Sequence, residues 1–212
     1  MDVRFTLLPG DPARLGDALR FLEDDARPEI EAEEGSLGMS LHENAELGAA
    51  LFETFWVSGD AARKAERTLR ALLSCAAKSA VATVSTEHYE VALFARAVRP
   101  HPGAGVRLTR LETEPSRVDE VVHAFQGTAM PSLREIEGFC EALLFVDRCT
   151  GRWIAETVWR DMNVLAASRS AAAAVRVDTV PLSGSVVRTV EEYRLVSSTV
   201  RRADVEALTV SP

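Results

Sequence analysis

An internal duplication constrains the fold of this chain more than any other feature of its sequence. A shift of 103 positions aligns residues 3–56 with residues 106–159 without a gap, and 15 of the 54 aligned positions are identical. At ordinary compositions, chance would give about three or four identities. The sharpest match sets Glu53-Thr54-Phe55-Trp56 against Glu156-Thr157-Val158-Trp159. The chain is therefore predicted to contain two copies of one folding unit.

The linker between the copies suggests their boundaries. Residues 100–105 read Pro-His-Pro-Gly-Ala-Gly, a stretch that continues neither a strand nor a helix. We expect a first repeat at residues 1–99, a second repeat at residues 104–197 and a polar C-terminal tail at residues 198–212.

Both repeats show the same order of expected elements, β-α-β-β-α-β. Asp11-Pro12 and Glu114-Pro115 open the first helix of each repeat, because proline is tolerated at the first helical position. The second helices are expected at residues 60–78 and 161–176, capped near Ser58 or Asp60 and near Asp161. Alternating, β-rich segments predict the strands. They are residues 3–8, 35–42, 49–56 and 83–94 in the first repeat, and residues 106–111, 138–146, 153–159 and 185–196 in the second.

This order of elements is the split βαβ, or ferredoxin-like, unit. Its sheet carries helices on one face and leaves an apolar second face that must be covered. Because both copies lie on one chain, the covering can be internal. We predict an α+β fold in which two fused ferredoxin-like βαββαβ units form an intramolecular pseudo-dimeric α/β barrel.

Composition narrows the classes of partner. The 24 basic and 32 acidic residues give a net charge of −8 with no Lys/Arg cluster, so no nucleic-acid partner is expected. No apolar run reaches the ~18 residues that cross a bilayer, and no secretory signal is evident at the N-terminus, so no membrane partner is expected. Three cysteines, Cys75, Cys140 and Cys149, fit a reducing cytoplasm. Of the basic residues only Lys64 and Lys78 are lysine, a bias that suggests a GC-rich bacterial genome.

The segment that follows the third strand carries a family resemblance. Residues 156–169 form a strand end at Trp159 followed by a capped helix rich in Ala and Leu, and Gly35 and Gly138 precede the second strands. This pattern resembles the antibiotic biosynthesis monooxygenase family, a subgroup of the dimeric α/β-barrel proteins. The resemblance covers nearly all of each repeat and implies a fused pseudo-dimer. The superfamily includes cofactor-free quinone-forming monooxygenases, haem-degrading oxygenases, lactone isomerases and proteins with no known activity.

The residues that define particular activities in that superfamily are replaced here. Haem-degrading members carry a His on the helix after the strand Trp and an Asn on the first strand. Anthrone-oxidising members carry an Asn shortly before the Trp. The helix position of the His holds Ala65-Glu66 and Ser168-Arg169 here. The first-strand position of the Asn holds Thr6 and Thr109, and the position before the Trp holds Phe52 and Ala155. No specific activity therefore follows from the resemblance.

Trp56 and Trp159 are the candidate substrate-binding residues. They end the third strands, where a cleft between helix and sheet would open, and a Trp ring can stack on a flat ligand. Alternatively, each fills the same slot in the core of its repeat, which is the commoner fate of Trp.

Glu53 and Glu156 lie an odd number of residues before Trp56 and Trp159 on the same strands, so they are expected to face the other side of the sheet. Arg4 and Arg107 lie on the neighbouring first strands. We expect Arg4–Glu53 and Arg107–Glu156 pairs that fix the strand register. The alternative is a general base with a raised pKa at Glu53 or Glu156.

His88 and His123 are the candidate catalytic bases, although a surface or hydrogen-bonded structural role is the commoner one. His42 ends a strand and His101 lies in the linker. No His pair has i, i+4 spacing and no Cys-x-x-Cys occurs, so no metal site is predicted. No phosphate loop or dinucleotide fingerprint occurs, so no organic cofactor is expected.

Two functions remain open. The first is a small soluble monooxygenase-like enzyme that acts on a flat aromatic or polyketide-type substrate without a cofactor. The second is a non-catalytic ligand-binding or accessory module of the same fold, and haem binding is a weaker third. The expected partner is a small aromatic molecule, and the chain could also form a homo-oligomer.

The two repeats differ in the bulk of their second helices. Ala166-Ala167-Ser168 and residues 171–174 are small, whereas Leu69, Leu72 and Leu73 with their basic neighbours are large. At equal backbone spacing, small side chains leave volume. We predict the larger pocket in the second repeat near Trp159, and a filled first repeat.

Overall fold

The computed structural model describes residues 1–200, which divide into two compact units. The first unit comprises residues 1–89 and 195–200, and the second comprises Glu90–Arg194. Most of the expected tail, residues 201–212, lies outside the described residues. Among residues 1–200, no helix has the length and apolar character needed to cross a membrane.

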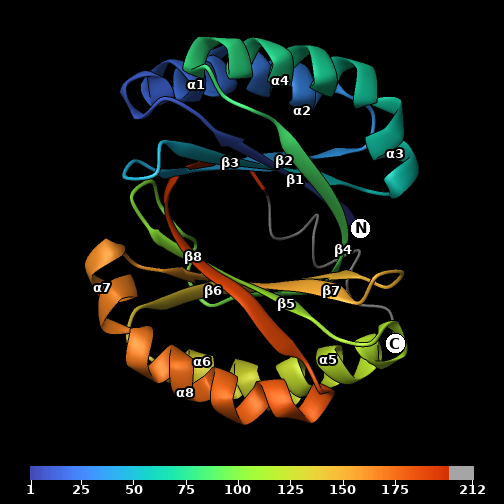
Figure 1. Ribbon diagram of the computed structural model, residues 1–212, viewed down its shortest axis with the longest axis vertical. Coiled ribbons are helices and arrows are strands. Elements are labelled where there is room, and N and C mark those ends of the chain that lie inside the picture. Colours follow the sequence, from blue (N-terminus) through green and yellow to red (C-terminus); the bar gives the residue numbers. More distant parts are fainter. Residues whose placement is uncertain (201–212) are drawn as a thin grey trace. The chain divides into compact units, whose positions relative to one another are not determined.

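The first unit is a sheet with helices on one face (Figure 1). Its strands β1, β3 and β2 are adjacent and antiparallel in that order. Residues 85–89 of β4 also belong to this unit. The elements are β1 (Asp2–Pro9), α1 (Leu15–Phe21), α2 (Arg27–Ala32), β2 (Ser36–Asn44), β3 (Ala49–Trp56), α3 (Gly59–Lys64), α4 (Glu66–Ala80) and β4 (Ser85–Arg96).

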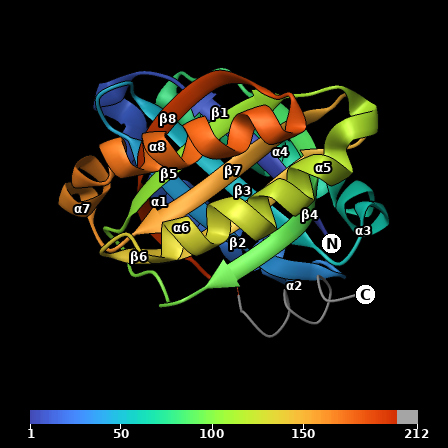
Figure 2. The ribbon, with the colours of Figure 1, turned by 90° about the horizontal axis from the view of Figure 1, so that it is seen from below.

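The second unit repeats this plan. Its strand order is β8-β5-β7-β6-β4, with antiparallel pairing between each two neighbours. Figure 2 looks onto its helices, where α8 and the α5–α6 run lie side by side over the strands. The elements are β5 (Gly105–Glu112), α5 (Val118–Ala124), α6 (Met130–Arg134), β6 (Phe139–Asp147), β7 (Arg152–Trp159), α7 (Met162–Ala167), α8 (Arg169–Thr179) and β8 (Val186–Ser198).

The α+β class and the ferredoxin-like order of elements are confirmed. All eight predicted strands are present, with ends within two residues of those expected. Each predicted second helix is in fact two helices. The short helices α3 and α7 end at Ala65 and Ser168, and the longer helices α4 and α8 begin directly after them. The caps are as expected, since Ser58 and Asp161 accept hydrogen bonds from the backbone N–H of Ala61 and Val164.

Two short helices, α2 and α6, are not among the predicted elements. Each follows a π-helical turn, η2 (Leu22–Ala26) or η4 (Phe125–Ala129), and each has a proline in its first turn. These are Pro28 and Pro131, which occupy equivalent positions of the repeats. Their recurrence was therefore a signal for a helix start.

Shared glycines mark backbone conformations that both repeats require. Gly35 and Gly138, which precede β2 and β6, have φ of +83° and +78°. At Gly138 an added Cβ would lie 2.5 Å from a methyl group of Val164 on α7. The positive φ and the close approach of the helix therefore both favour glycine there.

The core of each unit lies between its helices and its sheet. In β1 and β3, Arg4 stands opposite Thr54 and Phe5 stands opposite Glu53. Trp56 belongs to the cluster of buried apolar residues beneath the helices, and Trp159 occupies the same place in the second unit. Glu53 and Glu156 have the opposite parity along their strands, so the expected separation of Glu and Trp onto different faces holds.

Candidate functional site

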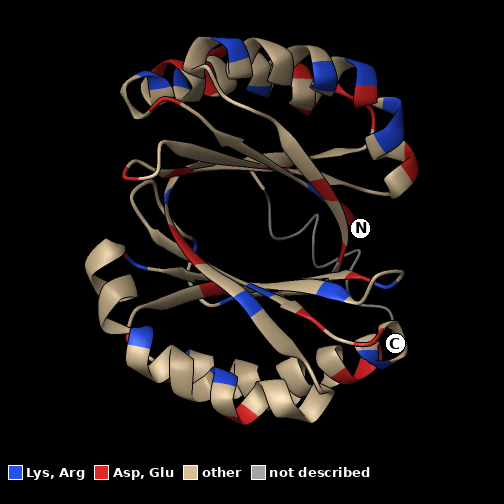
Figure 3. Ribbon diagram, viewed as in Figure 1, with Lys and Arg blue, Asp and Glu red and all other residues tan. Residues whose placement is uncertain are grey.

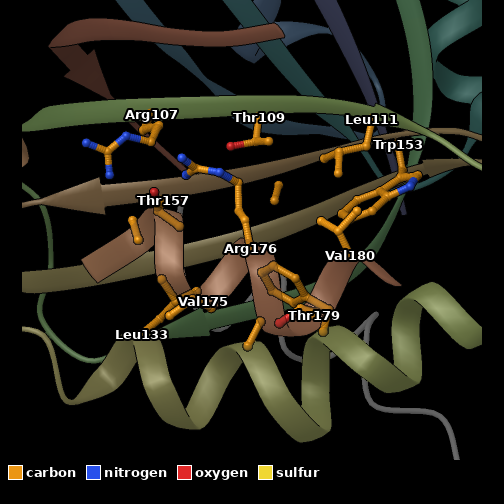
Figure 4. Close-up of a pocket in the computed structure, with 14 residues that line it drawn as sticks. Arg107, Thr109, Leu111, Leu133, Trp153, Thr157, Val175, Arg176, Thr179 and Val180 are labelled. Atoms are coloured by element: carbon orange, nitrogen blue, oxygen red, sulfur yellow. The ribbon is translucent and has the colours of Figure 1, made fainter. Parts of the chain in front are cut away.

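The second unit contains a cavity of about 40 Å³ between its sheet and its helices. Strands β5 and β7 supply one wall, and the opposite wall comes from α8, α6, η4 and the short 3₁₀ helix η5 (Val180–Ser183). Figure 4 shows these side chains converging on the space between the two layers. The lining residues are Arg107, Thr109, Leu111, Phe125, Ala129, Leu133, Trp153, Ala155, Thr157, Ala172, Val175, Arg176, Thr179 and Val180.

This cavity, called the cleft below, exists because small side chains occupy positions that are large in the first repeat. Ala155 and Ala172 correspond to Phe52 and Leu69 under the 103-residue shift. Phe52 and Leu69 are each only 1% exposed and belong to the first unit's core. The expectation that small helix residues leave volume in the second repeat therefore holds for the space between helix and sheet.

Two parts of the pocket prediction are wrong. Trp153 lines the cleft, and Trp159 does not. The first unit also has a larger groove, of about 540 Å³, lined by residues of α4, β1 and β4. The bulk of the helix residues that face the sheet does not determine this groove, because the polar side of α4 borders it.

Two arginines give one end of the cleft a positive charge. Arg107 is 2% exposed, and its Nη2 donates to Glu192 Oε1 and to the Leu165 carbonyl, both at 2.8 Å. Its Nη1 donates to Ser168 Oγ at 3.0 Å. Arg176 is half-buried, and it has no hydrogen bond or ion pair with any of residues 1–200. In Figure 4 its guanidinium extends from α8 toward Arg107.

The charge of Arg176 is costly where it lies. Burial and the neighbouring positive charge of Arg107 lower the pKa of the Arg176 guanidinium, against a smaller opposing effect of the Glu192 carboxylate. Glu192 is held as a carboxylate: burial acts to raise its pKa, but hydrogen bonds from Arg169 and Arg107 outweigh this and lower it. That carboxylate is bonded to Arg107 and Arg169, so Arg176 remains available to an anion in the cleft.

The rest of the cleft is apolar, with hydroxyl groups at its edges. Thr179 is 5% exposed, and its Oγ1 has no hydrogen-bond partner within residues 1–200. A buried hydroxyl without a partner is unfavourable, so a polar atom of a ligand could satisfy it. Trp153 lies at the other end of the cleft from the two arginines (Figure 4), and its Nε1 donates to Ser185 Oγ at 3.2 Å.

The predicted stacking residues Trp56 and Trp159 are both fully buried. Each indole Nε1 donates to the Thr two residues earlier, at 2.9 Å to Thr54 and 3.1 Å to Thr157. Neither ring lines the cleft or the first unit's groove. A role in substrate stacking stays a prediction for both, and their surroundings favour a packing role.

Replacing Trp159 with Phe separates these roles. The variant keeps an apolar ring in the core but removes the Nε1 hydrogen bond, so we expect a loss of about 1 kcal/mol in the free energy of unfolding. Chemical denaturation measures this loss, and aromatic-ligand affinity should remain that of the unmodified chain. A fall in affinity without loss of stability would instead assign Trp159 to the binding site.

Neither of the two candidate bases lines the cleft. His123 is exposed on α5, with Nδ1 2.7 Å from the carbonyl oxygen of Asp119. His88 lies on β4 and lines the groove of the first unit together with Arg4 and Glu66. Desolvation and the positive charge of Arg4 lower the pKa of the His88 imidazole. The two histidines thus belong to different units of the chain.

The expected Arg–Glu pairs are wrong in both repeats. Arg4 bonds to Glu66 on α4, and Arg107 bonds to Glu192 on β8. The first and third strands are neighbours as predicted, but Glu53 is in register with Phe5 and Glu156 with Leu108. Adjacent strand positions point to opposite faces, so Arg and Glu cannot meet.

A buried His–Glu contact takes the place of the expected pair in the first unit. His42 Nε2 lies 3.3 Å from Glu53 Oε2, and both side chains are at most 1% exposed. His42 on β2 and Glu53 on β3 are brought together by the hairpin, in which His42 is in register with Leu51 and Ser40 with Glu53.

Comparison with known proteins supports the fold. No family model matches the chain. Two uncharacterized proteins of Mycobacterium tuberculosis, Rv2558 and Rv2557, are 25% and 22% identical to it, over 93% and 85% of this chain and 84% and 81% of their own lengths.

Solved structures give the same fold at low sequence identity. A provisionally named monooxygenase from Lactobacillus acidophilus superposes with a TM-score of 0.67 at 14% identity, covering 94% of this chain and 95% of its own. An anthrone oxidase-like protein gives 0.66 at 16% identity, covering 93% and 92%. A Listeria monocytogenes ferredoxin-fold protein related to antibiotic biosynthesis monooxygenases gives 0.50 at 9%, covering 93% and 95%. The chain thus has a monooxygenase-like fold.

Proposed function

We propose that the cleft of the second unit binds a small flat aromatic molecule with an acidic phenol or enol group, and that the chain oxidises it with O₂ without an organic cofactor. The observation that carries this proposal is the unpaired guanidinium of Arg176 beside Arg107, at one end of an otherwise apolar cleft. An apolar wall suits the ring system, and the positive end suits the anion that the acidic group forms.

The proposed reaction begins with the anion of the phenol or enol group, which the two arginines of the cleft stabilise. Arg176 and Arg107 lower the pKa of a bound phenol or enol, and its proton passes to water. The electron-rich anion then reacts with O₂ at a methylene carbon. A C–O bond forms there to give a hydroperoxide, and loss of the remaining C–H proton then breaks the O–O bond. The CH₂ group and O₂ thereby become C=O and H₂O. The apolar walls limit access of bulk water, and the Thr179 hydroxyl can donate to an oxygen of the substrate.

Binding requires the cleft to widen. Its volume of about 40 Å³ is below the roughly 300–1,000 Å³ of ordinary ligand pockets. Val175 and Arg176 on α8 are only half-buried. Rotation of the Val175 side chain toward solvent would add volume and leave the Arg176 guanidinium in the cleft.

A non-catalytic ligand-binding module is the second candidate. It is favoured by one specific observation: none of the residues that line the cleft is His, Asp, Glu, Cys, Tyr or Lys. The cleft therefore offers no ordinary general base of its own, although it offers a binding site for an aromatic anion.

Oxygen uptake in the presence of a hydroxyanthrone tests the proposal. We expect uptake with the unmodified chain, and a rate at least about tenfold lower for Arg176→Gln, since a charge-assisted hydrogen bond contributes about 1.5–3 kcal/mol. Arg134→Gln, an exposed position on α6, is the matched control and should retain the rate.

Two other results would decide against catalysis. Hydroxyanthrone binding that depends on Arg176 but gives no oxygen uptake would assign the chain to the binding-module class. Absence of both binding and uptake would overturn the proposed site.

A further inference from the structure

The groove of the first unit has the composition of a second ligand site. It has a volume of about 540 Å³ and lies between α4 and residues of β1 and β4. The groove lies partly at the position of the cleft, because Arg4, Leu73 and Ala77 are the counterparts of Arg107, Arg176 and Val180. The apolar interior of the cleft, however, is filled in the first unit by Phe52, Leu69 and neighbouring core residues. The lining residues are Arg4, Glu66, Arg70, Leu73, Ser74, Ala77, Lys78, Ala82, Val84, Thr86 and His88.

One side of the groove is cationic in a chain whose net charge is −8. Arg4, Arg70 and Lys78 line it, against the single carboxylate of Glu66. Figure 3 shows that Lys and Arg recur along α4, which forms this border. Glu66 is ionised: burial acts to raise its pKa, but hydrogen bonds and charges of Arg70 and Arg4 lower it. The local excess of positive charge favours an anion.

Arg4 has an unused donor at this place. The residue is 5% exposed, and Glu66 occupies its Nη1. Its Nε is buried and has no hydrogen-bond partner within residues 1–200. A buried N–H of a charged group that lacks an acceptor is unfavourable. A carboxylate oxygen in the groove would satisfy it with a charge-assisted bond.

The other side of the groove is apolar. Leu73 and Ala77 come from α4, and Ala82 and Val84 come from the segment before β4. Val84 is 45% exposed, so a hydrocarbon chain against it would remove apolar surface from water. The groove thus combines a cationic wall with a short apolar wall.

We propose that this groove binds a small organic acid, with its carboxylate at Arg4, Lys78 and His88 and its apolar body against Leu73, Ala77 and Val84. The site is independent of the cleft in the second unit. It would serve an aliphatic acid as well as an aromatic one, because no Phe, Trp or Tyr side chain lines it.

Titration with hexanoate tests the proposal, followed by calorimetry and by the NMR resonances of the histidine ring protons. We expect a saturable shift of the His88 resonance, assigned with His88→Gln, while His101 and His123 stay unchanged. Hexanol, which lacks the charge, and acetate, which lacks the apolar body, should each bind at least about tenfold more weakly than hexanoate.

Charge variants at the groove give opposite expected directions. Lys78→Gln should weaken hexanoate binding by about tenfold, since it removes a charged partner. Glu66→Gln should strengthen binding, because it removes the competing carboxylate. Arg63→Gln on α3, an exposed residue outside the groove, is the control and should bind as the unmodified chain does.

The proposal is overturned if hexanoate leaves the His88 resonance unmoved up to high concentration, or if hexanol binds equally well. It is also overturned if Lys78→Gln and Arg63→Gln behave alike. Arg176→Gln should leave hexanoate binding unchanged. Loss of binding in that variant would place the acid in the cleft and not in the groove.

Discussion

Replacing Arg107 with Ala is expected to lower the free energy of unfolding by about 3 kcal/mol. The side chain is 2% exposed and donates to Glu192, Ser168 and the Leu165 carbonyl. Its loss leaves the Leu165 carbonyl without this donor and leaves a void beside Trp159, whose ring lies 5.9 Å from the guanidinium carbon. Glu192 keeps its bond to Arg169, so the cost stays below that of an entirely unpaired buried charge.

Urea denaturation followed by circular dichroism measures this change. Arg188→Ala is the matched control, because Arg188 is 59% exposed and pairs with Glu112 at 43% exposure. Exposed pairs of this kind contribute roughly 0–1 kcal/mol. Arg107→Lys, which keeps the charge but not the planar fork of donors, should fall between the two. Equal losses for Arg107→Ala and Arg188→Ala would show that the buried network does not stabilise the fold.

The fold was predictable because its signals are local and occur twice. Strand alternation, the caps at Ser58 and Asp161 and the turn glycines each determine a short stretch of backbone. The 103-residue repeat then allows every element to be read from two sequences. Pro28 and Pro131 carried the same kind of signal for α2 and α6, but a helix of five or six residues has too few apolar positions to show a period.

Side-chain partners were harder to predict, since they depend on register. Placing β1 beside β3 was correct, yet a one-residue difference in register decides whether Arg4 faces Glu53 or Thr54. The true partners, Glu66 on α4 and Glu192 on β8, lie on elements whose positions the strand pattern does not determine. The contact between His42 and Glu53 has the same origin in the β2–β3 register.

The sequence predicted why the second unit has a cleft, but it did not predict which residues line that cleft. Small side chains on α8 did predict space in the second unit. Arg176 and Thr179 follow Ala172 at helical spacing, on the same face of α8. That spacing was the available signal for a cationic group aimed at the sheet. Trp153, which corresponds to Ala50 in the first repeat, was a second signal, because a large residue replaces a small one at a shared position.

Filling the cleft is expected to abolish binding of the aromatic anion while preserving the fold. Ala172→Leu introduces the residue that the first repeat has at the same position, Leu69. Three added carbon atoms would occupy a cavity of about 40 Å³. We expect hydroxyanthrone affinity to fall at least about 100-fold, equivalent to about 2.8 kcal/mol. Fluorescence titration measures the affinity, and urea denaturation should show a stability change within about 1.5 kcal/mol in either direction.

A second variant keeps this test decisive if the side chain introduced by Ala172→Leu proves too large beside Trp153. Trp153→Ala, Ala155→Phe and Ala172→Leu together reproduce Ala50, Phe52 and Leu69, a set that already packs without a cleft in the first unit. Ala171→Leu, at an exposed position of α8, adds the same side chain without entering the cleft and should bind normally. If the triple variant folds and still binds hydroxyanthrone with full affinity, the ligand does not occupy the cleft. Loss of affinity in the triple variant, with binding retained by Ala171→Leu, would show that the ligand occupies the cleft. Binding would then depend on the volume left by the small residues of the second repeat.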